Sequence, residues 1–335
     1  MKPRIMLLHN EPVLPQGHPD AESERDVLDT AAAVESILRA GGLDVLRFGV
    51  GADLRPFLAL LNDDPPDAVF NLFEGFANRP ITETTIAGIL EWIQIPFTGN
   101  STDTLTLARD KMRTKHLFRG AGLPTAPFYS VDGKNAQEHT LGWPVIVKPI
   151  GQDASVGIDQ HSVVSNQKSL TERVAWVCER YRGPALVEQF IPGREFLIHV
   201  FEGLPNESGI RVPTVIPASE IQFLDKELWP IYSYDAKWTE NTREFDKTAE
   251  VPAVPMPEAF RAQLDDLAIR AYRLLGCRDY ARVDVRVTPE GAPYLLELNP
   301  NPYLLGIGLM GGLTAMGKTH TEFVLELAMA ALGRG

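Results

Sequence analysis

Oxygen-bearing side chains alternate with apolar residues in two adjacent strand-like segments near the C-terminus. The first segment, Tyr280–Val287, is joined by a turn at 289–292 to a second segment at 294–299. Side chains in a strand point to its two faces in turn. Arg282 and Asp284 should therefore share one face, while the intervening valines point toward the core. The two segments together predict a β-hairpin with one polar face.

The return segment supplies further oxygen donors. With the turn centred between residues 290 and 291, Asp284 lies opposite Glu297 and Arg282 lies opposite Asn299. A set of oxygen ligands alone suits Mg²⁺ or Mn²⁺, typically where the ion bridges to nucleotide phosphates. A solvated hairpin face with cross-strand ion pairs is the alternative. Because Glu297 interrupts an otherwise apolar run, we favour a metal site.

A lysine and a glycine-rich stretch occur together in the middle of the chain. Lys148 ends an apolar strand, where a charge is costly unless it has an anionic partner. The polar stretch 151–157 could close over phosphates through its backbone N–H groups, or could be a flexible turn. Taken alone, Lys111 is best read as a solvated helix residue and 188–191 as a strand that runs into a hinge.

One motif is predicted to be misleading. The stretch Gly312–Thr319 satisfies the P-loop expression GxxxxGK[ST]. Such a loop must follow a buried parallel strand and lead into further sheet. Here a glycine-broken segment, 304–311, precedes it, and only one helix remains before the chain ends. We therefore interpret it as the lead-in to the last helix.

The elements that must position these residues follow from the hydrophobic pattern. In the first hundred residues strands alternate with helices, which indicates a doubly wound, mostly parallel sheet. The expected strands are 4–8, 43–48, 68–73 and 95–98, and the expected helices are about 20–40 and 84–92. A helix at about 104–119 and a smaller α+β unit follow, with strands at 144–148 and 185–189 around a helix at 169–181.

The last third combines a strand at 195–201, a helix at 257–275, the hairpin and a final helix at 319–332. Residues 219–255 are polar and aromatic and fit no regular element. A loop of that length in a compact domain suggests a functional flap.

Composition limits the functional class. The chain has 335 residues, a formal net charge of −12 and no run of Lys or Arg, which disfavours nucleic acid and anionic membranes as partners. No apolar run approaches the roughly 20 residues of a membrane span. Its two cysteines, Cys178 and Cys277, are too few for a disulfide framework. We therefore expect a cytoplasmic protein of two or three domains that binds small molecules.

In this order, the motifs resemble the D-alanine–D-alanine ligase branch of the ATP-grasp superfamily over nearly the whole chain. The matching stretches are Ser23-Glu-Arg-Asp-Val27, Gly88-Ile-Leu-Glu91 with Ile95-Pro-Phe-Thr-Gly99, Asp110-Lys111, Val147-Lys-Pro149, Ser155-Val-Gly-Ile158, Val187-Glu-Gln-Phe190 with Gly193-Arg-Glu195, Tyr234-Asp-Ala-Lys-Trp238, Ala281-Arg-Val-Asp284 and Leu296-Glu-Leu-Asn299.

The resemblance implies an α/β, three-domain ATP-grasp fold. Residues 1–103 would form an N-terminal doubly wound parallel sheet that binds substrate. Residues 104–191 would form a central α+β subdomain, and 192–335 a C-terminal mixed-sheet α+β domain. ATP would lie between the second and third parts.

The resemblance also implies a role for each site residue. Lys111 and Lys148 would contact ATP phosphates beneath Ser155, and Lys237 would reach the γ-phosphate from the flap. Adenine and ribose would be held by Glu188, Gln189, Phe190, Ile191 and Glu195. Two Mg²⁺ ions would be bound by Asp284, Glu297 and Asn299. Arg282 would stabilise the tetrahedral oxyanion, and Glu24 would meet the amine of the first substrate.

The chain departs from the family pattern around the substrates. Ala154 replaces the first of two serines, Trp238 replaces a flap tyrosine, and Glu74-Gly75 replaces a His-Gly motif. The stretch after Asn299 is also different, and Gly308 stands about where a serine would bind the acceptor carboxylate. The ATP chemistry is expected to be kept, with a rebuilt acceptor pocket.

These features predict an ATP-dependent ligase that activates a carboxylate as an acyl phosphate and joins it to an amine. The expected substrates are small molecules, amino acids or peptides, with a homodimer as an open alternative to a single chain. A true D-alanine–D-alanine ligase is the nearest alternative. An ATP-grasp kinase or a nucleotide-binding regulator without ligase activity is another.

Overall fold

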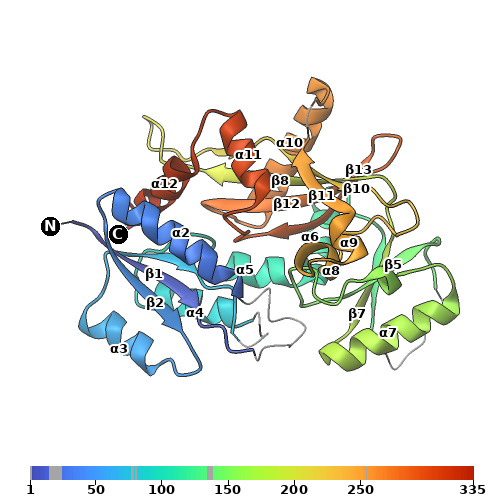
Figure 1. Cartoon of the computed structure of the whole chain (residues 1–335), viewed down its shortest axis with the longest axis horizontal. Helices are drawn as coiled ribbons and strands as arrows, with labels where there is room; N and C mark the ends of the chain where they lie inside the picture. The colour runs from blue at the N-terminus through green and yellow to red at the C-terminus, as the bar shows by residue number, and fades with distance from the viewer. Residues whose placement is uncertain (1, 15–24, 77–78, 80, 134–138, 254) are drawn as a thin grey trace.

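Three β-sheets with covering helices make up the computed structural model (Figure 1). The structure describes residues 2–14, 25–76, 79, 81–133, 139–253 and 255–335. Among these residues no helix has both the length and the apolar content needed to cross a lipid bilayer.

The first sheet is parallel, in the order β2-β1-β3, and has helices on both faces. Ile5 and Leu7 of β1 pack toward α2 and the C-terminal helix α12, while Met6 and Leu8 pack toward α3 and α4. The predicted doubly wound sheet is confirmed. Its elements are β1 (Arg4–Asn10), α2 (Val27–Ala40), β2 (Asp44–Val50), α3 (Arg55–Asp63), β3 (Ala68–Leu72), α4 (Thr82–Trp92) and α12 (His320–Leu332).

The second sheet is antiparallel, in the order β4-β7-β5-β6. Helix α7 covers one face, where it packs on Val145 and Val147. Ile146 belongs to a separate apolar cluster with Phe190 and Ile231, on the side of the candidate site. The elements are β4 (Phe128–Val131), β5 (Val145–Pro149), the 3₁₀ turn η1 (Gln160–Ser162), β6 (Val163–Val164), α7 (Gln167–Tyr181) and β7 (Ala185–Gln189).

The third sheet has six antiparallel strands in the order β11-β10-β8-β12-β13, with β9 also paired to β8. Helices α5, α6 and α10 contribute residues to the hydrophobic cluster on one face, and the opposite face carries the polar residues of the hairpin. The elements are α5 (Thr102–Arg109), α6 (Lys111–Gly120), β8 (Arg194–Glu202), β9 (Pro213–Val215), β10 (Ser219–Phe223), α8 (Tyr234–Trp238), α9 (Arg243–Asp246), β11 (Thr248–Pro252), α10 (Glu258–Leu274), β12 (Tyr280–Val287), β13 (Pro293–Asn299) and α11 (Ile307–Ala315).

The helix expected at 104–119 is in fact two helices. Asp110 leaves the helical conformation, and its side chain accepts a hydrogen bond from the Arg113 amide at 3.0 Å, which caps α6. An aspartate that binds the backbone in this way stops one helix and starts another. Lys111 is thereby placed in the first turn of α6.

The predicted flap at 219–255 is shorter than expected. Its ends are the strands β10 and β11, which pair with each other in the third sheet. The segment 224–247 remains as a cover over the candidate site. A strand was also expected at 95–98, but that segment makes only one parallel bridge, between Phe97 and Val69.

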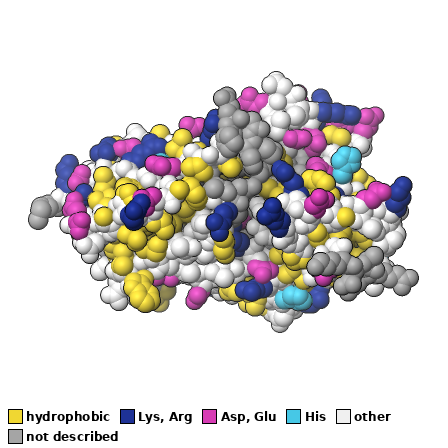
Figure 2. Space-filling view, turned by 90° about the horizontal axis from the view of Figure 1, so that it is seen from below, with side chains coloured by type: hydrophobic (Ala, Val, Ile, Leu, Met, Phe, Trp, Pro, Cys, Tyr) yellow, Lys and Arg dark blue, Asp and Glu magenta, His cyan; other side chains and the backbone are white. Residues whose placement is uncertain are grey.

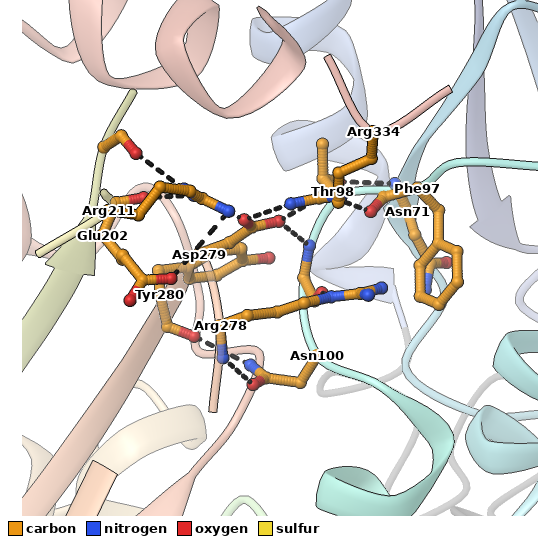
Figure 3. A network of polar contacts seen from close by, with 12 residues as sticks. Asn71, Phe97, Thr98, Asn100, Glu202, Arg211, Arg278, Asp279, Tyr280 and Arg334 are labelled. Atoms are coloured by element: carbon orange, nitrogen blue, oxygen red, sulfur yellow. Dashed lines mark hydrogen bonds and ion pairs between the residues drawn. The ribbon is translucent and has the colours of Figure 1, made fainter. Parts of the chain in front are cut away.

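A buried carboxylate connects the first sheet to the third at the start of β12 (Figure 3). Asp279 is fully buried and binds both Arg211, at 2.8 Å, and Arg334, at 2.7 Å. Its second oxygen accepts a hydrogen bond from the Gly99 amide at 2.8 Å. Asn100 adds a bond to the Tyr280 carbonyl at 2.9 Å.

Hydrophobic side chains gather on the left of the face seen in Figure 2, the side on which Figure 1 places α3 and α4. The exposed apolar residues of these two helices include Leu58 and Trp92, and Trp92 is 88% exposed.

Asp279→Asn should lower the thermal unfolding midpoint. The amide keeps the shape of the carboxylate and tolerates the left-handed backbone at this position (φ +61°). It removes the charge that two arginines share, and losing one partner of such a buried network costs about 3 kcal/mol. The control is Asp53→Asn, which alters an exposed ion pair with Arg55. Equal midpoints for the two variants would contradict this role of Asp279.

Candidate active site

Three rows of side chains cross the polar face of the third sheet. Strand pairing aligns β8, β12 and β13, so that residues two apart on each strand lie on this face, while Val283 and Val285 point into the core. The rows are Glu195 with Arg286, then Leu197 with Asp284 and Glu297, then His199 with Arg282 and Asn299.

A β-bulge sets the composition of these rows. On the turn side of the bulge Val285 pairs with Leu295, and on the other side Asp284 pairs with Glu297. Leu296 therefore has no residue opposite it. Leu295 and Leu298 are three positions apart, yet both pack in the same core cluster. An extra residue is needed to bring them to one face.

The predicted pairs Asp284–Glu297 and Arg282–Asn299 are therefore confirmed. The turn itself is centred one half-residue earlier than expected, on Glu290. Without the bulge, Glu297 would stand opposite Val283, on the core face.

The three predicted metal ligands meet on this face. Arg282 binds both oxygens of Asp284, at 2.7 and 2.9 Å, and the Asn299 amide donates to Asp284 at 3.1 Å. Lys111 lies 3.3 Å from Glu297. Burial opposes ionisation of Glu297, but Lys111, Lys148, Lys237 and Arg282 outweigh it and lower the pKa of this carboxyl to about 2.

Within the described ranges no three His, Cys, Asp or Glu side chains gather as a metal site on their own. The third oxygen of a metal site here would come from the Asn299 amide, turned so that its oxygen faces the two carboxylates.

A cavity of about 90 Å³ separates the second sheet from the third. It is lined by all of the residues for which the sequence predicts nucleotide contacts. These are Lys111, Lys148, Glu188, Gln189, Phe190, Ile191, Glu195 and Lys237. Ser155, Asp284 and Glu297 line it as well.

Glu188 lies between two lysines inside this part of the protein. Lys148 is 3.0 Å from one of its oxygens, and Lys115 contacts the other. Burial opposes ionisation, but the two ammonium groups outweigh it and lower the pKa of Glu188. Sequence reasoning missed Lys115, which is 1% exposed, because it is 73 residues from its partner.

Sequence reasoning also missed Arg286. It lies two residues beyond the aspartate on the polar face and is 3.2 Å from Glu195. It also donates to the carbonyls of Ile191 and Pro230, at 3.0 and 2.8 Å. The period-two pattern that selected Arg282 and Asp284 would have found it.

The glycine-rich loop is tied to the helices beneath it. Lys111 donates to the Gln152 carbonyl at 2.5 Å, and Arg109 binds Asp153 at 2.8 Å. Arg109 also contacts the buried Glu83 of α4. The nearby carboxylates outweigh the burial of Lys111 and raise its pKa. The phosphate-binding candidates are thus held on a preformed frame.

The cover packs directly on this loop. Ser155 donates to the Tyr232 carbonyl at 2.7 Å, and the Trp238 indole donates to the Ala154 carbonyl at 3.0 Å. Lys237 lies over the Tyr232 ring, 4.5 Å from its centroid. In the described part of the chain Lys237 has no carboxylate within ion-pair distance. Burial and the charge of Arg282 lower its pKa.

A larger cavity of about 430 Å³ opens between the first sheet and the third. Its walls include Glu74 and Glu83 on one side and His199, Arg282 and Glu297 on the other. Glu74 is exposed where it faces the cavity. Partial loss of solvent from the protein packed around the cavity, together with the nearby carboxylates of Glu83 and Asp26, raises the pKa of Glu74 to about 8. Because the two cavities share Lys237 and Glu297, they meet beside the hairpin.

The residues around position 308 leave no room for a side chain, so a glycine is required there. A side chain there would collide with Glu250 and Ser219, whose hydroxyl donates to the Glu250 carboxylate at 2.5 Å. The sequence pointed to an altered acceptor pocket at Gly308, and the structure adds Glu250 as its neighbour. Sequence reasoning missed Glu250, as well as His199, because neither lies in a recognisable motif.

Two remaining predictions concern other parts of the chain. Glu24, expected to meet the first substrate's amine, lies outside the described residues. The P-loop-like stretch ends one helix, α11, and leads into another, α12, instead of following a parallel strand. Its Lys318 is paired with Glu326. The interpretation of this motif as a helix lead-in agrees with that arrangement.

Known proteins resemble this chain over most of its length. The family model described as D-ala D-ala ligase C-terminus matches residues 117–326. The D-alanine–D-alanine ligase B of Chromobacterium violaceum is 32% identical over 287 residues, which cover 84% of this chain and 85% of that protein. The D-alanine–D-alanine ligase of Ralstonia pickettii is 33% identical over 318 residues, which cover 92% and 88%.

Among solved structures, the D-alanine–D-alanine ligase from Bacillus anthracis complexed with ATP aligns with a TM-score of 0.74. The alignment covers 98% of this chain and 97% of that one, at 19% identity. The likeness shows the same fold, and the predicted ATP-grasp architecture is thereby confirmed.

His199 should make the protein sensitive to acid. It is 6% exposed, and burial, with the charge of Arg282, lowers its pKa to about 3. An unfolded histidine binds a proton below about pH 6.5. The folded state therefore loses stability as the pH falls below that value, by about 2 kcal/mol at pH 5.

His199→Asn should remove this part of the pH dependence, as measured by urea unfolding at pH 8 and pH 5. The matched control is His161→Asn, at an exposed histidine. If the His199 variant lost as much stability between the two pH values as the control, the proposed neutral, buried state of this ring would be wrong.

Proposed function

Because the chain belongs to the D-alanine–D-alanine ligase family and is an ATP-dependent carbon–nitrogen ligase, we propose that it activates a carboxylate substrate as an acyl phosphate and joins it to an amine. The carboxylate oxygen would attack the γ-phosphorus of ATP and release ADP. The amine nitrogen would then bond to the acyl carbon as phosphate leaves, with loss of a proton from nitrogen.

The observation that carries this proposal is the position of Lys237. It lines the smaller cavity with Lys111 and Lys148, forms no ion pair with the described residues, and has the ring of Tyr232 beneath its ammonium group. A buried ammonium group is costly without a negative partner. ATP phosphates in the smaller cavity would supply that partner, within reach of Lys111 and Lys148.

The hairpin suits Mg²⁺ as the companion of ATP. Asp284, Glu297 and Asn299 are hard oxygen donors on one face, and Glu297 remains ionised at any physiological pH. These residues would hold the ions. Bound there, Mg²⁺ would offset negative charge on the phosphates. Arg282 and Lys111 contact the same carboxylates.

The protein's own groups would perform the remaining tasks. Arg282 lines the larger cavity, is bound to Asp284 of the smaller one, and would stabilise the tetrahedral oxyanion. Glu195, with Arg286 behind it, would hold the ribose, and residues 188–191 would hold adenine. Ser155 would fix the glycine-rich loop over the phosphates. Glu24 would meet the first substrate's amine.

The cover would keep water from the acyl phosphate. It is attached to the glycine-rich loop through Tyr232 and Trp238. It is also bound to Arg286 through the Pro230 carbonyl. An acyl phosphate hydrolyses if water reaches it, so closure of such a lid must precede the chemistry.

The substrates would bind in the larger cavity. We infer that they are small amino acids, peptides or related amines, and that Glu74, Trp238 and Gly308 change the shape and charge of their pocket. A true D-alanine–D-alanine ligase fits the family membership equally well. A kinase or a regulator without ligase activity is disfavoured because both metal-binding carboxylates and Arg282 are kept.

We also infer a cytoplasmic location, since the described cysteines, Cys178 and Cys277, are both free. The domain boundaries stay predictions, at 103/104 and 191/192. The homodimer also stays a prediction. Sedimentation of the purified protein would test the assembly.

Asp284→Asn and Glu297→Gln should each lower ATP turnover at least about 100-fold, because they remove charge that acts on the phosphates. Both substitutions are close in shape, so the thermal unfolding midpoint should change little. The measurement is ADP release at saturating Mg²⁺. Glu290→Gln in the hairpin turn is the control. If either site variant kept a tenth of the wild-type turnover, the metal assignment would fail.

The experiment that tests the function is incubation with ATP, Mg²⁺ and pooled amino acids and other amines, with phosphate release and product masses read together. We expect one phosphate released per amide formed and little D-alanyl-D-alanine. Efficient synthesis of that dipeptide would establish the alternative. Phosphate transfer without any amide product would favour a kinase.

A further inference from the structure

We infer that the amine substrate of this ligase carries a second, positively charged group at its far end, which Glu250 and His199 recognise in the larger cavity. The inference rests on the proposed function and names the class of its acceptor: a diamine or another cationic amine, in place of an amino acid with a free carboxylate.

Glu250 provides the negative charge. It lies on β11, lines the cavity, and has as its hydrogen-bond donor the hydroxyl of the buried Ser219. In the described part of the chain no Lys or Arg forms an ion pair with it. The nearby guanidinium of Arg282 is already bound to both oxygens of Asp284. The carboxylate is thus left available for a ligand cation.

His199 provides a second polar contact in the same cavity. Its ring is almost completely buried, lines the cavity wall, and has no hydrogen-bond partner at Nδ1. Buried polar atoms in proteins nearly always have a partner. A neutral imidazole nitrogen can accept a hydrogen bond from an ammonium or guanidinium group. Nδ1 itself is closed off from the cavity, so the contact with a donor on the ligand is expected at Nε2, the other ring nitrogen.

Helix α11 shows why a carboxylate would be rejected. Its first residues, Gly306 and Ile307, line the cavity, and the N-terminus of a helix favours negative charge. Glu250 already takes that place, because its oxygen lies where a side chain on Gly308 would be. A substrate carboxylate would meet the protein's own carboxylate there.

The charged residues around the larger cavity also favour a cationic amine over a carboxylate. Among the described residues that line the cavity, carboxylic acids outnumber Lys and Arg. Glu83 and Asp153 are occupied by Arg109, and Glu297 by Lys111. Glu250 forms no such pair with the described residues, and it accepts a hydrogen bond from the Ser219 hydroxyl.

The test first identifies the carboxylate substrate with hydroxylamine as the amine. Hydroxylamine is too small to reach from the acyl carbon to the far end of the cavity, so hydroxamate formation reports activation alone. With that carboxylate, amines of equal length are then compared, such as 1,4-diaminobutane with 4-aminobutyrate, over chains of three to six carbons. The kcat/KM of each pair is measured by amide formation.

We expect the wild-type protein to prefer the diamine of the best length by at least about tenfold, comparable to one charge-assisted hydrogen bond. Glu250→Gln should bring this ratio close to one by raising the KM of the diamine, while hydroxamate formation is unchanged. The control is Glu220→Gln on β10, whose carboxylate is engaged by Arg194 at 2.6 Å and does not line the cavity.

A wild-type preference for amino acids, or a ratio that Glu250→Gln leaves unchanged, would overturn the inference while leaving the ligase activity established. Absence of hydroxamate with every carboxylate would overturn the proposed function, and the inference with it. A loss of hydroxamate formation in Glu250→Gln would place this residue in activation, which also contradicts a role in acceptor recognition.

Discussion

The buried carboxylate of Asp279 is the constraint on which the geometry of the site depends. It bonds at once to Gly99, at the edge of the first sheet, to Arg334 at the C-terminal end and to Arg211 beyond β8. The residue after it begins β12, the strand that carries Arg282 and Asp284. The larger cavity has one wall in the first sheet and the other on β12 and β13. This carboxylate, together with the bond from Asn100 to the Tyr280 carbonyl, therefore helps to fix the separation of those walls.

From that anchored start, β12 distributes charge along a single face. Successive rows carry an ion pair, then two carboxylates, then an arginine with a neutral histidine. The two cavities on this face differ in their lysines. Lys111, Lys148 and Lys237 line the smaller one, whereas Lys237 is the only lysine among the described residues that line the larger one. A polyanion and an amine would be drawn to different cavities that meet at Glu297 and Lys237, where the bond between substrates would form.

Several of these groups are held in costly positions. Lys115 and Glu188 are almost completely buried, and a buried pair is often no more stable than a hydrophobic replacement. The imidazole of His199 has an unpartnered nitrogen, and Ala154 and Ser155 have left-handed backbones without being glycine. All of these residues lie at the two cavities or next to them. Costly arrangements of this kind are expected at functional sites.

The sequence by itself determined the elements and chemical groups that depend on local order. Alternation of side chains in Tyr280–Val287 and 294–299 was enough to predict the hairpin, its polar face and the pairing of Asp284 with Glu297. The strand-helix alternation of the first hundred residues was enough to predict a doubly wound sheet. Ordered motifs were enough to predict the nucleotide-site residues, which share one cavity.

Only the tertiary structure decided how distant residues meet. Lys115 and Glu188 are far apart in the chain, and their contact depends on how α6 packs against the second sheet. The bulge at Leu296 follows from the burial of Leu295 and Leu298 in one core, which no local pattern specifies. The partners of Glu250 and the missing partner of His199 depend on three separate segments packed together. Local periodicity carries no information on such contacts, because it records which face a residue occupies and not what lies opposite that face.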